Sequence, residues 1–182
     1  RLENSRQWAL RCVHELQQHE DSMFLTLTYD ERHIPRNHSL DIKVWQKFMY
    51  RLRQHIKPTR CRFFAAGEYG QGDELNKLGR PHYHAIIFGY RFPDMVLWKT
   101  SKTGHDLMMS ETLNKLWPFG NANIGQVTFD SCAYVARYVT KKINGEMAAD
   151  HYTRIDPSSG ELFKLVPEFS TCSRRPGIGK GW

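Results

Sequence analysis

The sequence lacks several features that define common protein classes. Its four cysteines are widely separated and form no Cys-x-x-Cys pair, which argues against a disulfide framework and a zinc knuckle and favours a reducing cytoplasm. No apolar run approaches the roughly 18 residues that cross a bilayer, and no signal peptide is visible. A Walker loop is also absent, because Gly177-Ile-Gly-Lys180 lacks the required spacing. We therefore expect neither a membrane partner nor a bound nucleotide.

What the sequence does contain favours one globular domain with an anionic partner. Its 182 residues suit a single domain, and a hydrophobic content of 40% is enough to build one core. The net charge of +7 indicates a polyanion such as nucleic acid, although a merely basic surface would give the same value. The chain starts and stops mid-pattern without an initiator Met. We expect residues 1–182 to form one domain that is a fragment of a longer protein.

The hydrophobic periodicity predicts an α+β fold, with an antiparallel sheet and flanking helices. A loop is expected around Trp98, and Asp130 or Ser131 is expected to cap the last long helix. The order of elements is that of the ferredoxin-like or RNA-recognition-type fold, in which the first and third strands are central. The expected helices span 5–17, 41–57, 110–117 and 131–143; the expected strands span 24–29, 62–68, 81–89 and 124–129, followed by a hairpin at 151–166.

A pair of histidines lies within the third expected strand. Side chains two residues apart on a strand share a face, so His82 and His84 point the same way and could grip one metal ion. A bare His-x-His is common, and two ordinary surface histidines would give the same pattern. Glu68 closes the preceding strand, and a hairpin between the two strands would bring it close to His82. Two imidazoles and one carboxylate suit Mn²⁺ or Mg²⁺, with zinc less favoured but not excluded.

Two tyrosines lie one turn apart on the last long helix. The apolar stripe of that helix is predicted to leave Tyr134 and Tyr138 on roughly the opposite side, with Lys141 and Lys142 nearby. Phenols beside cations make sense if both meet a phosphate. The alternative is that the two tyrosines are half-buried against a neighbouring element.

These motifs together resemble the HUH endonucleases, named for their histidine–hydrophobic–histidine triplet, and most closely the replication initiators of gokushoviruses, small single-stranded DNA phages of the microvirus family. The resembling blocks span nearly the whole chain. They are Arg6-Gln-Trp8, Phe24-Leu-Thr-Leu-Thr-Tyr-Asp30, Gly67-Glu-Tyr-Gly70, Gly79-Arg-Pro-His-Tyr-His84, Lys115-Leu-Trp-Pro-Phe-Gly120, Ala133-Tyr-Val-Ala-Arg-Tyr138 and Ser173-Arg-Arg-Pro-Gly177.

The resemblance implies a rolling-circle replication initiator that acts on a single-stranded DNA origin in the cytoplasm of a bacterial host, where host replication proteins are possible partners. It implies a metal at Glu68, His82 and His84, and a tyrosine that attacks a backbone phosphate to form a 5′-phosphotyrosine link. Tyr138 is followed three residues later by Lys141, as in single-tyrosine relatives, which favours Tyr138 for the first nick. Further DNA contacts are expected from Trp98, Arg137, Lys142, Arg174 and Arg175.

Two other functions remain open from the sequence. A non-catalytic RNA-recognition-type module should carry a Gly-aromatic pattern on its third strand, where this chain has Pro81-His-Tyr-His84. A zinc hydrolase could use His82, His84 and Glu68 with an activated water, but it leaves the paired tyrosines unexplained.

Overall fold

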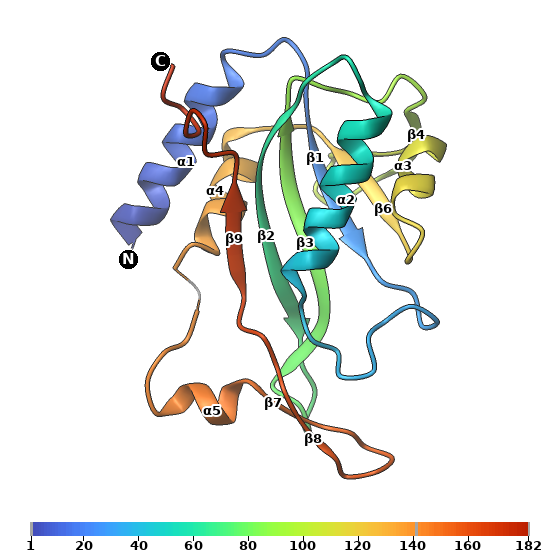
Figure 1. Cartoon of the computed structure of the whole chain (residues 1–182), viewed down its shortest axis with the longest axis vertical. Helices are drawn as coiled ribbons and strands as arrows, with labels where there is room; N and C mark the ends of the chain where they lie inside the picture. The colour runs from blue at the N-terminus through green and yellow to red at the C-terminus, as the bar shows by residue number, and fades with distance from the viewer. Residues whose placement is uncertain (1, 141, 182) are drawn as a thin grey trace.

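A seven-stranded antiparallel sheet forms the centre of the molecule (Figure 1), which we describe from a computed structural model covering residues 2–140 and 142–181. Its strands are β1 (Ser22–Thr28), β2 (Arg62–Gln71), β3 (Leu78–Phe88), β4 (Val96–Thr100), β5 (Asp106–Met109), β6 (Ala122–Gly125) and β9 (Phe169–Cys172). They lie in the order β4-β5-β6-β1-β3-β2-β9. The inner four, β6-β1-β3-β2, have the strand order of the ferredoxin-like fold, so the predicted α+β class and the central position of the first and third predicted strands are confirmed.

Helices cover both faces of this sheet. The helix α2 lies across one face, while α1 and α4 pack together on the other (Figure 1). A separate two-stranded sheet, β7-β8, confirms the predicted hairpin. The bounds are α1 (Leu2–Leu16), α2 (Ile42–His55), α3 (Glu111–Leu116), α4 (Phe129–Arg137), α5 (Met147–His151), β7 (Thr153–Ile155) and β8 (Leu162–Lys164).

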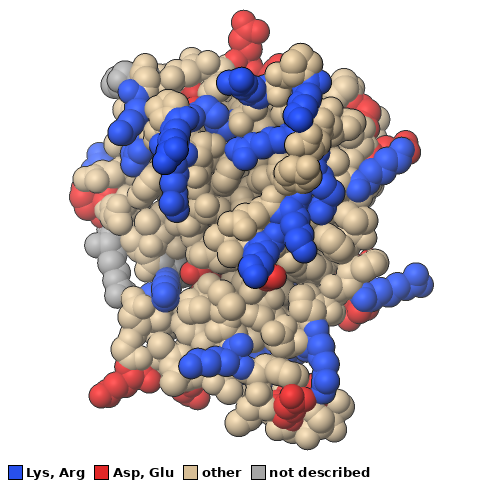
Figure 2. Space-filling view, in the orientation of Figure 1, with Lys and Arg blue, Asp and Glu red and all other residues tan. Residues whose placement is uncertain are grey.

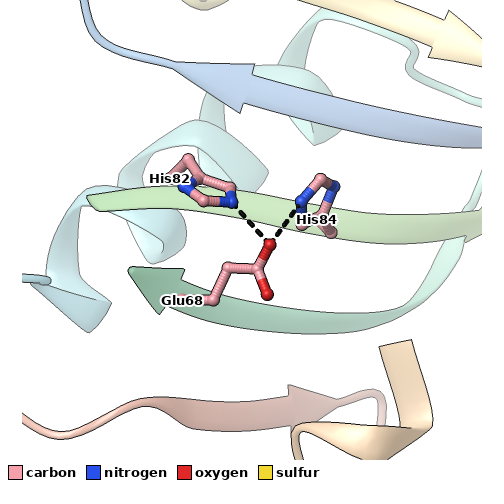
Figure 3. A group of neighbouring side chains, drawn as sticks. All are labelled: Glu68, His82 and His84. Carbon is pink, nitrogen blue, oxygen red and sulfur yellow. Dashed lines mark hydrogen bonds and ion pairs between the residues drawn. The ribbon is translucent and has the colours of Figure 1, made fainter. Parts of the chain in front are cut away.

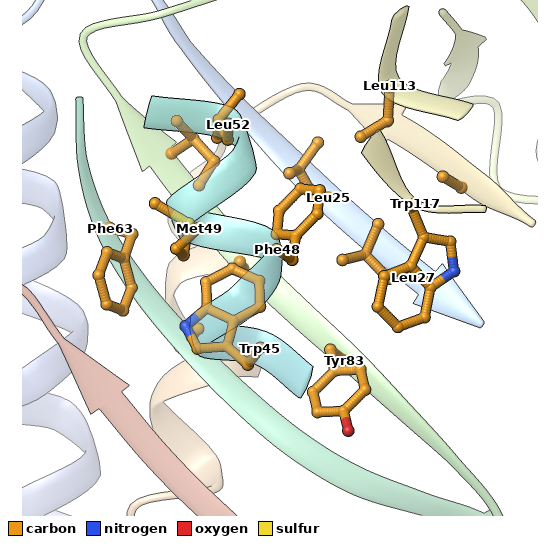
Figure 4. Close-up of a cluster of buried hydrophobic side chains, with 14 of the residues drawn as sticks. Leu25, Leu27, Trp45, Phe48, Met49, Leu52, Phe63, Tyr83, Leu113 and Trp117 are labelled. Atoms are coloured by element: carbon orange, nitrogen blue, oxygen red, sulfur yellow. The ribbon is translucent and has the colours of Figure 1, made fainter. Parts of the chain in front are cut away.

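The larger core lies between α2 and the sheet (Figure 4). Asp41 starts α2 by accepting a hydrogen bond from the Lys43 N–H, and apolar side chains at helical spacing then face the strands. Tyr83, the middle residue of the His-Tyr-His triplet, points into this core and donates its hydroxyl to the Asp41 carbonyl at 3.0 Å. Because neighbours on a strand alternate faces, burying Tyr83 commits both histidines to the opposite face.

The second core lies under α1 and α4, on the face that carries the histidines. Phe64 and Ala66 of β2 and Ile86 and Phe88 of β3 are buried there against the two helices. These positions are two residues apart along each strand, so the same alternation continues to Glu68 and His84. The core and the histidine site therefore share one sheet face.

Three predicted elements differ in the structure. The segment around Trp98 was expected to be a loop but forms the hairpin β4–β5, because two β-forming runs flank a turn in which Gly104 takes φ +82°. The helix expected to reach 143 ends at Arg137; the Thr140 hydroxyl binds the Arg137 carbonyl, in competition with a further helical turn. Its cap is Thr128, in a capping box with Ser131, rather than Asp130 or Ser131.

Two further elements, α5 and β9, were absent from the sequence prediction. The short strand β9 extends the sheet by pairing with β2. Among the described residues, no helix combines the length and the apolar character that crossing a bilayer requires.

Candidate active site

Glu68, His82 and His84 converge on one point of the sheet (Figure 3). Glu68 lies directly opposite His82 in the β2–β3 register, as the hairpin prediction required. Its Oε1 is 2.5 Å from His82 Nε2 and 2.8 Å from His84 Nε2. The two imidazole rings are nearly perpendicular, with centroids 5.0 Å apart. The structure thus brings together the three residues that the sequence nominated, as a group that could hold a metal ion.

The second nitrogen of each imidazole has its own partner. His84 Nδ1 lies 3.1 Å from the Thr26 hydroxyl, and His82 Nδ1 lies 3.1 Å from the Arg80 carbonyl. Such contacts hold a ring in place and leave the Nε2 atoms directed at Glu68. Phe24 stacks on the His84 ring with a centroid distance of 5.6 Å. Both rings are therefore oriented before any ligand arrives.

The charge state of the three groups suits a cation. Burial by itself raises the pKa of the Glu68 carboxyl, but its interactions with His82 and His84 outweigh burial and lower that pKa to about 2. Burial lowers the pKa of His84, which favours the neutral imidazole that ligates metals. At neutral pH the site thus offers one carboxylate and a neutral imidazole at His84.

One further observation shows that these residues fit a metal ion. The second carboxylate oxygen, Glu68 Oε2, is buried and has no hydrogen-bond partner among the described residues. A buried carboxylate oxygen normally finds a partner, because leaving one unsatisfied costs free energy. Two imidazoles and a carboxylate also form a donor set that Mn²⁺, Mg²⁺ or Zn²⁺ accepts.

Tyr134 reaches this group from α4. Its hydroxyl donates to Glu68 Oε1 at 2.8 Å and lies 3.4 Å from His84 Nε2. Burial, together with the Glu68 carboxylate, raises the pKa of the Tyr134 phenol above its ordinary value. The Arg137 guanidinium lies 5.1 Å from the centre of the Tyr134 ring. The phenol is therefore placed beside both the carboxylate and a cation.

Tyr138 occupies a different environment. It is the C-cap residue of α4, is only 7% exposed and belongs to the core under α1 and α4. The prediction that both tyrosines lie opposite the apolar stripe is therefore wrong for Tyr138, because the helix ends before it and the chain turns it inward. Its ring centroid lies 5.5 Å from that of Tyr134. Lys141, the proposed catalytic lysine, lies outside the described residues.

The expected DNA contacts lie in several places. Arg137 is at the site, and Lys142 is exposed just after α4. Trp98 is 46% exposed on β4, at one edge of the sheet, with the Lys99 ammonium 4.1 Å from its ring centre. Arg174 and Arg175 are exposed in the tail that follows β9, at the other edge. Figure 2 shows Lys and Arg gathered over the upper half of the face in view, so basic charge extends beyond the site.

Two residues of the site escaped the sequence prediction. Thr26 and Phe24 lie on β1, and both contact His84. Their alternation along the strand places them on one face, but nothing in the sequence states that β1 pairs with β3 in the register that sets Thr26 opposite His84.

Comparison with known proteins gives a consistent result. A family model for the replication-associated protein ORF2 matches residues 22–143. The replication-associated protein VP4 of Bdellovibrio phage phiMH2K is 35% identical and covers 100% of this chain and 54% of the relative. The replication-associated protein ORF2 of Spiroplasma virus 4 is 32% identical and covers 98% of this chain and 52% of the relative.

A third relative, the replication-associated protein ORF4 of Chlamydia phage 1, is 34% identical over 76% of this chain. The chain spans about half the length of the first two relatives. No solved structure gave a significant match. The phage relatives and the family model confirm the resemblance seen in the sequence, and the chain belongs to the family of the replication-associated protein ORF2.

Proposed function

We propose that this chain is the nicking domain of a replication initiator, in which the Tyr134 phenol attacks a backbone phosphate of single-stranded DNA beside a divalent cation. One observation carries the proposal: the Tyr134 hydroxyl lies 2.8 Å from Glu68 Oε1, within the group that could hold the cation. A nucleophile next to a cation site is the arrangement that phosphoryl transfer needs. Membership in a family of replication-associated proteins supports DNA as the substrate.

In the proposed step, a bond forms between the Tyr134 oxygen and phosphorus while the bond from phosphorus to the 3′ oxygen breaks. The products are a 5′-phosphotyrosine link and, once the 3′ oxygen takes up a proton, a 3′-hydroxyl primer. The phosphotyrosine ester retains the energy needed for later rejoining, so no nucleotide is consumed. The proton of Tyr134 leaves toward Glu68 Oε1, the acceptor that its hydroxyl already faces.

The cation is expected to be Mn²⁺ or Mg²⁺, held by Glu68, His82 and His84. When bound, it would withdraw charge from the scissile phosphate and hold that phosphate in line with the nucleophile. Burial and the Glu68 charge raise the pKa of Tyr134, so the phenol stays protonated at neutral pH while that charge is unopposed. Cleavage should therefore stop when a chelator removes the cation.

We assign the first nick to Tyr134 rather than to Tyr138, which the sequence favoured. The reason is access, because the Tyr138 side chain is buried and the Tyr134 hydroxyl faces the metal ligands. Tyr138 would act in the second cleavage of a rolling circle, after the end of α4 shifts. Lys141 is kept as the group that approaches the phosphate or the leaving oxygen, on the strength of its spacing from Tyr138 alone.

The wider setting of the proposal follows the resemblance. Single-stranded origin DNA would be held by Arg137 and Lys142 near the site, with Arg174, Arg175 and Trp98 farther along the strand. The reaction would take place in the cytoplasm of a bacterial host, together with host replication proteins. Residues 1–182 would form one endonuclease domain of a longer protein.

The two alternatives are less well supported. A zinc hydrolase has no use for a phenol that bonds a metal ligand, as Tyr134 does. An RNA-recognition-type module binds nucleic acid on an open sheet face, whereas α1 and α4 cover part of that face here.

A strand-cleavage assay separates these functions. The protein is incubated with Mn²⁺ and single-stranded DNA from a phage origin, labelled at either end, and run on a denaturing gel. The proposal expects the 3′-end label to migrate with the protein and the 5′-end label to appear on a shorter unattached fragment. Cleavage without a covalent adduct would favour the hydrolase, and tight binding without cleavage would favour the binding module.

A further inference from the structure

A cavity of about 760 Å³ opens beside the candidate active site. Its walls come from four places in the chain: the start of β1, the end of β6, the β4–β5 hairpin and the first turn of α4. His84 and Tyr134 also line it, so the cavity is continuous with the site. Its volume lies within the roughly 300–1,000 Å³ typical of ligand pockets. The reaction proposed above does not account for this space.

The lining of the cavity combines apolar surface with hydrogen-bonding groups. Phe24, Leu107 and Ile124 supply apolar surface. The exposed Gln126 amide can donate and accept, and the hairpin turn adds Ser101. A nucleobase has the matching chemistry, with apolar faces that stack and edges that carry donors and acceptors.

The charges around the cavity disfavour a phosphate within it. Asp106 and Asp130 bring two carboxylates, against one guanidinium from Arg91. The chain as a whole carries +7, so this acidic balance is local. A phosphate would be repelled toward the triad and Arg137, while a neutral base would not. The charge pattern thus separates a place for the backbone from a place for the bases.

The hairpin that closes the cavity is held in shape by its own turn. The Ser101 N–H donates to the His105 carbonyl at 2.7 Å, and the His105 N–H donates to the Ser101 hydroxyl at 3.0 Å. In the sheet, β5 joins β6 through the single register pair Met108–Ile124 among the described residues. The hairpin therefore presents an ordered tip on a lightly attached arm, which suits a wall that closes over a ligand.

We propose that this cavity receives one or two nucleobases next to the scissile phosphate and sets the base preference of the cut. The inference rests on the proposed nicking function and extends it to recognition. Phe24 joins the two parts physically, since it lines the cavity, stacks on His84 and meets the Tyr134 ring edge at a centroid distance of 6.4 Å. A base seated here would hold its own phosphate against the nucleophile.

Gly125 offers a direct way to test the proposal. It lies opposite Phe24 in the β1–β6 register and lines the cavity. A Cβ added at Gly125 would meet Leu107 and Phe24 at 3.9–4.0 Å, which is ordinary van der Waals contact. Gly125→Val should therefore fold and fill the cavity, because a β-branched residue suits a strand. Gly125→Ala adds one methyl group and serves as the matched control.

The experiment scans an oligonucleotide with abasic substitutions, one position at a time, across the cut. In the wild type, removal of a base that the cavity holds should slow adduct formation by roughly 10–100-fold, as expected for loss of base stacking. Gly125→Val should cut the intact strand more slowly and lose this sensitivity, while Gly125→Ala should keep it. Gln126→Ala should flatten the base preference at the same position, and the exposed Gln54→Ala on α2 should not.

Equal sensitivity of wild type and Gly125→Val to every abasic position would overturn the inference. The same oligonucleotides are also compared by fluorescence anisotropy, which needs no cleavage. If the wild type forms no adduct on any strand, the proposed nicking function fails, yet the cavity is still judged by binding. Abasic discrimination that disappears in Gly125→Val then supports base recognition, and discrimination that persists contradicts it.

Discussion

The Tyr134 hydroxyl donates its hydrogen bond to Glu68 Oε1, the same oxygen that faces the Nε2 atoms of both histidines. A single carboxylate oxygen therefore connects the candidate nucleophile to the candidate metal ligands. A cation bound at this oxygen would have to displace the Tyr134 contact or share the oxygen with it, so metal binding and the position of the phenol are coupled.

The first prediction distinguishes the two tyrosines. Tyr134→Phe should lose nearly all adduct formation on a short origin oligonucleotide, because it removes the hydroxyl that faces Glu68. Tyr138→Phe should keep the first nick and fail in repeated cleavage and circle closure. Peptide mapping of the adduct checks the assignment, and DNA found mainly on Tyr138 would reverse it. An adduct that survives in the double variant would refute the tyrosine mechanism itself.

The second prediction concerns the metal ligands. Glu68→Ala should weaken Mn²⁺ affinity by roughly 10–1000-fold through loss of one of three ligands. His82→Ala and His84→Ala should abolish cleavage and leave much of the DNA affinity, since backbone charge supplies most binding. Calorimetric titration with Mn²⁺ measures the first effect, with the exposed Glu74→Ala as control. Unchanged affinity in Glu68→Ala would remove Glu68 from the site.

The third prediction concerns Thr26 as a positioning residue. Thr26→Val removes the hydroxyl that lies 3.1 Å from His84 Nδ1 and keeps the shape of the side chain. We expect Mn²⁺ affinity to fall by about 10-fold or more, while the circular dichroism spectrum stays unchanged. Thr28→Val is the matched control, since the Thr28 hydroxyl bonds the Asn121 carbonyl instead of a histidine. Equal metal affinities for the two variants would mean that Thr26 does not orient His84.

The fourth prediction concerns salt. If Arg137, Arg174 and Arg175 each neutralise a phosphate, each Arg→Ala change should reduce the slope of log affinity against log salt by about 0.7 for single strands. Lys164→Ala, on β8, should leave the slope unchanged. Anisotropy titrations across salt concentrations provide the measurement. A flat dependence in the wild type would show that the basic charge is incidental to DNA binding.

The fifth prediction concerns pH and stability. Burial alone raises the pKa of Glu15, but the Gly179 N–H, His19 and Arg62 together lower it below its ordinary value. A carboxyl with a lowered pKa in the folded state stabilises the fold above the unfolded pKa of about 4.3, and this stabilisation is lost as pH falls below that value. Glu15→Gln should cost about 1–3 kcal/mol at pH 7.

The same substitution should cost much less at pH 3, because Glu15 is then losing its charge in the wild type as well. Thermal unfolding at both pH values, with the exposed Glu20→Gln as control, measures the difference. A destabilisation of equal size at pH 3 and pH 7 would show that packing, rather than the charge of Glu15, holds the C-terminal tail against α1.

The sequence by itself determined the parts of this protein that depend on local periodicity. The alternation in Pro81-His-Tyr-His84 placed both histidines on one face, and the spacing of Trp45 and Phe48 identified α2. A turn between two strands put Glu68 near His82, and the register confirms that pairing. Such features need only the two-residue repeat of a strand and the 3.6-residue turn of a helix.

Tertiary structure alone decided which tyrosine reaches the metal ligands. A helical wheel treats Tyr134 and Tyr138 alike, but α4 ends at Arg137, where the Thr140 hydroxyl binds the Arg137 carbonyl and also contacts Ser5 of α1. The pairing of β4 with β5 and of β9 with β2 was likewise settled by contacts between segments distant in sequence. Helix ends and edge strands depend on what the neighbouring elements offer, and no local pattern records that.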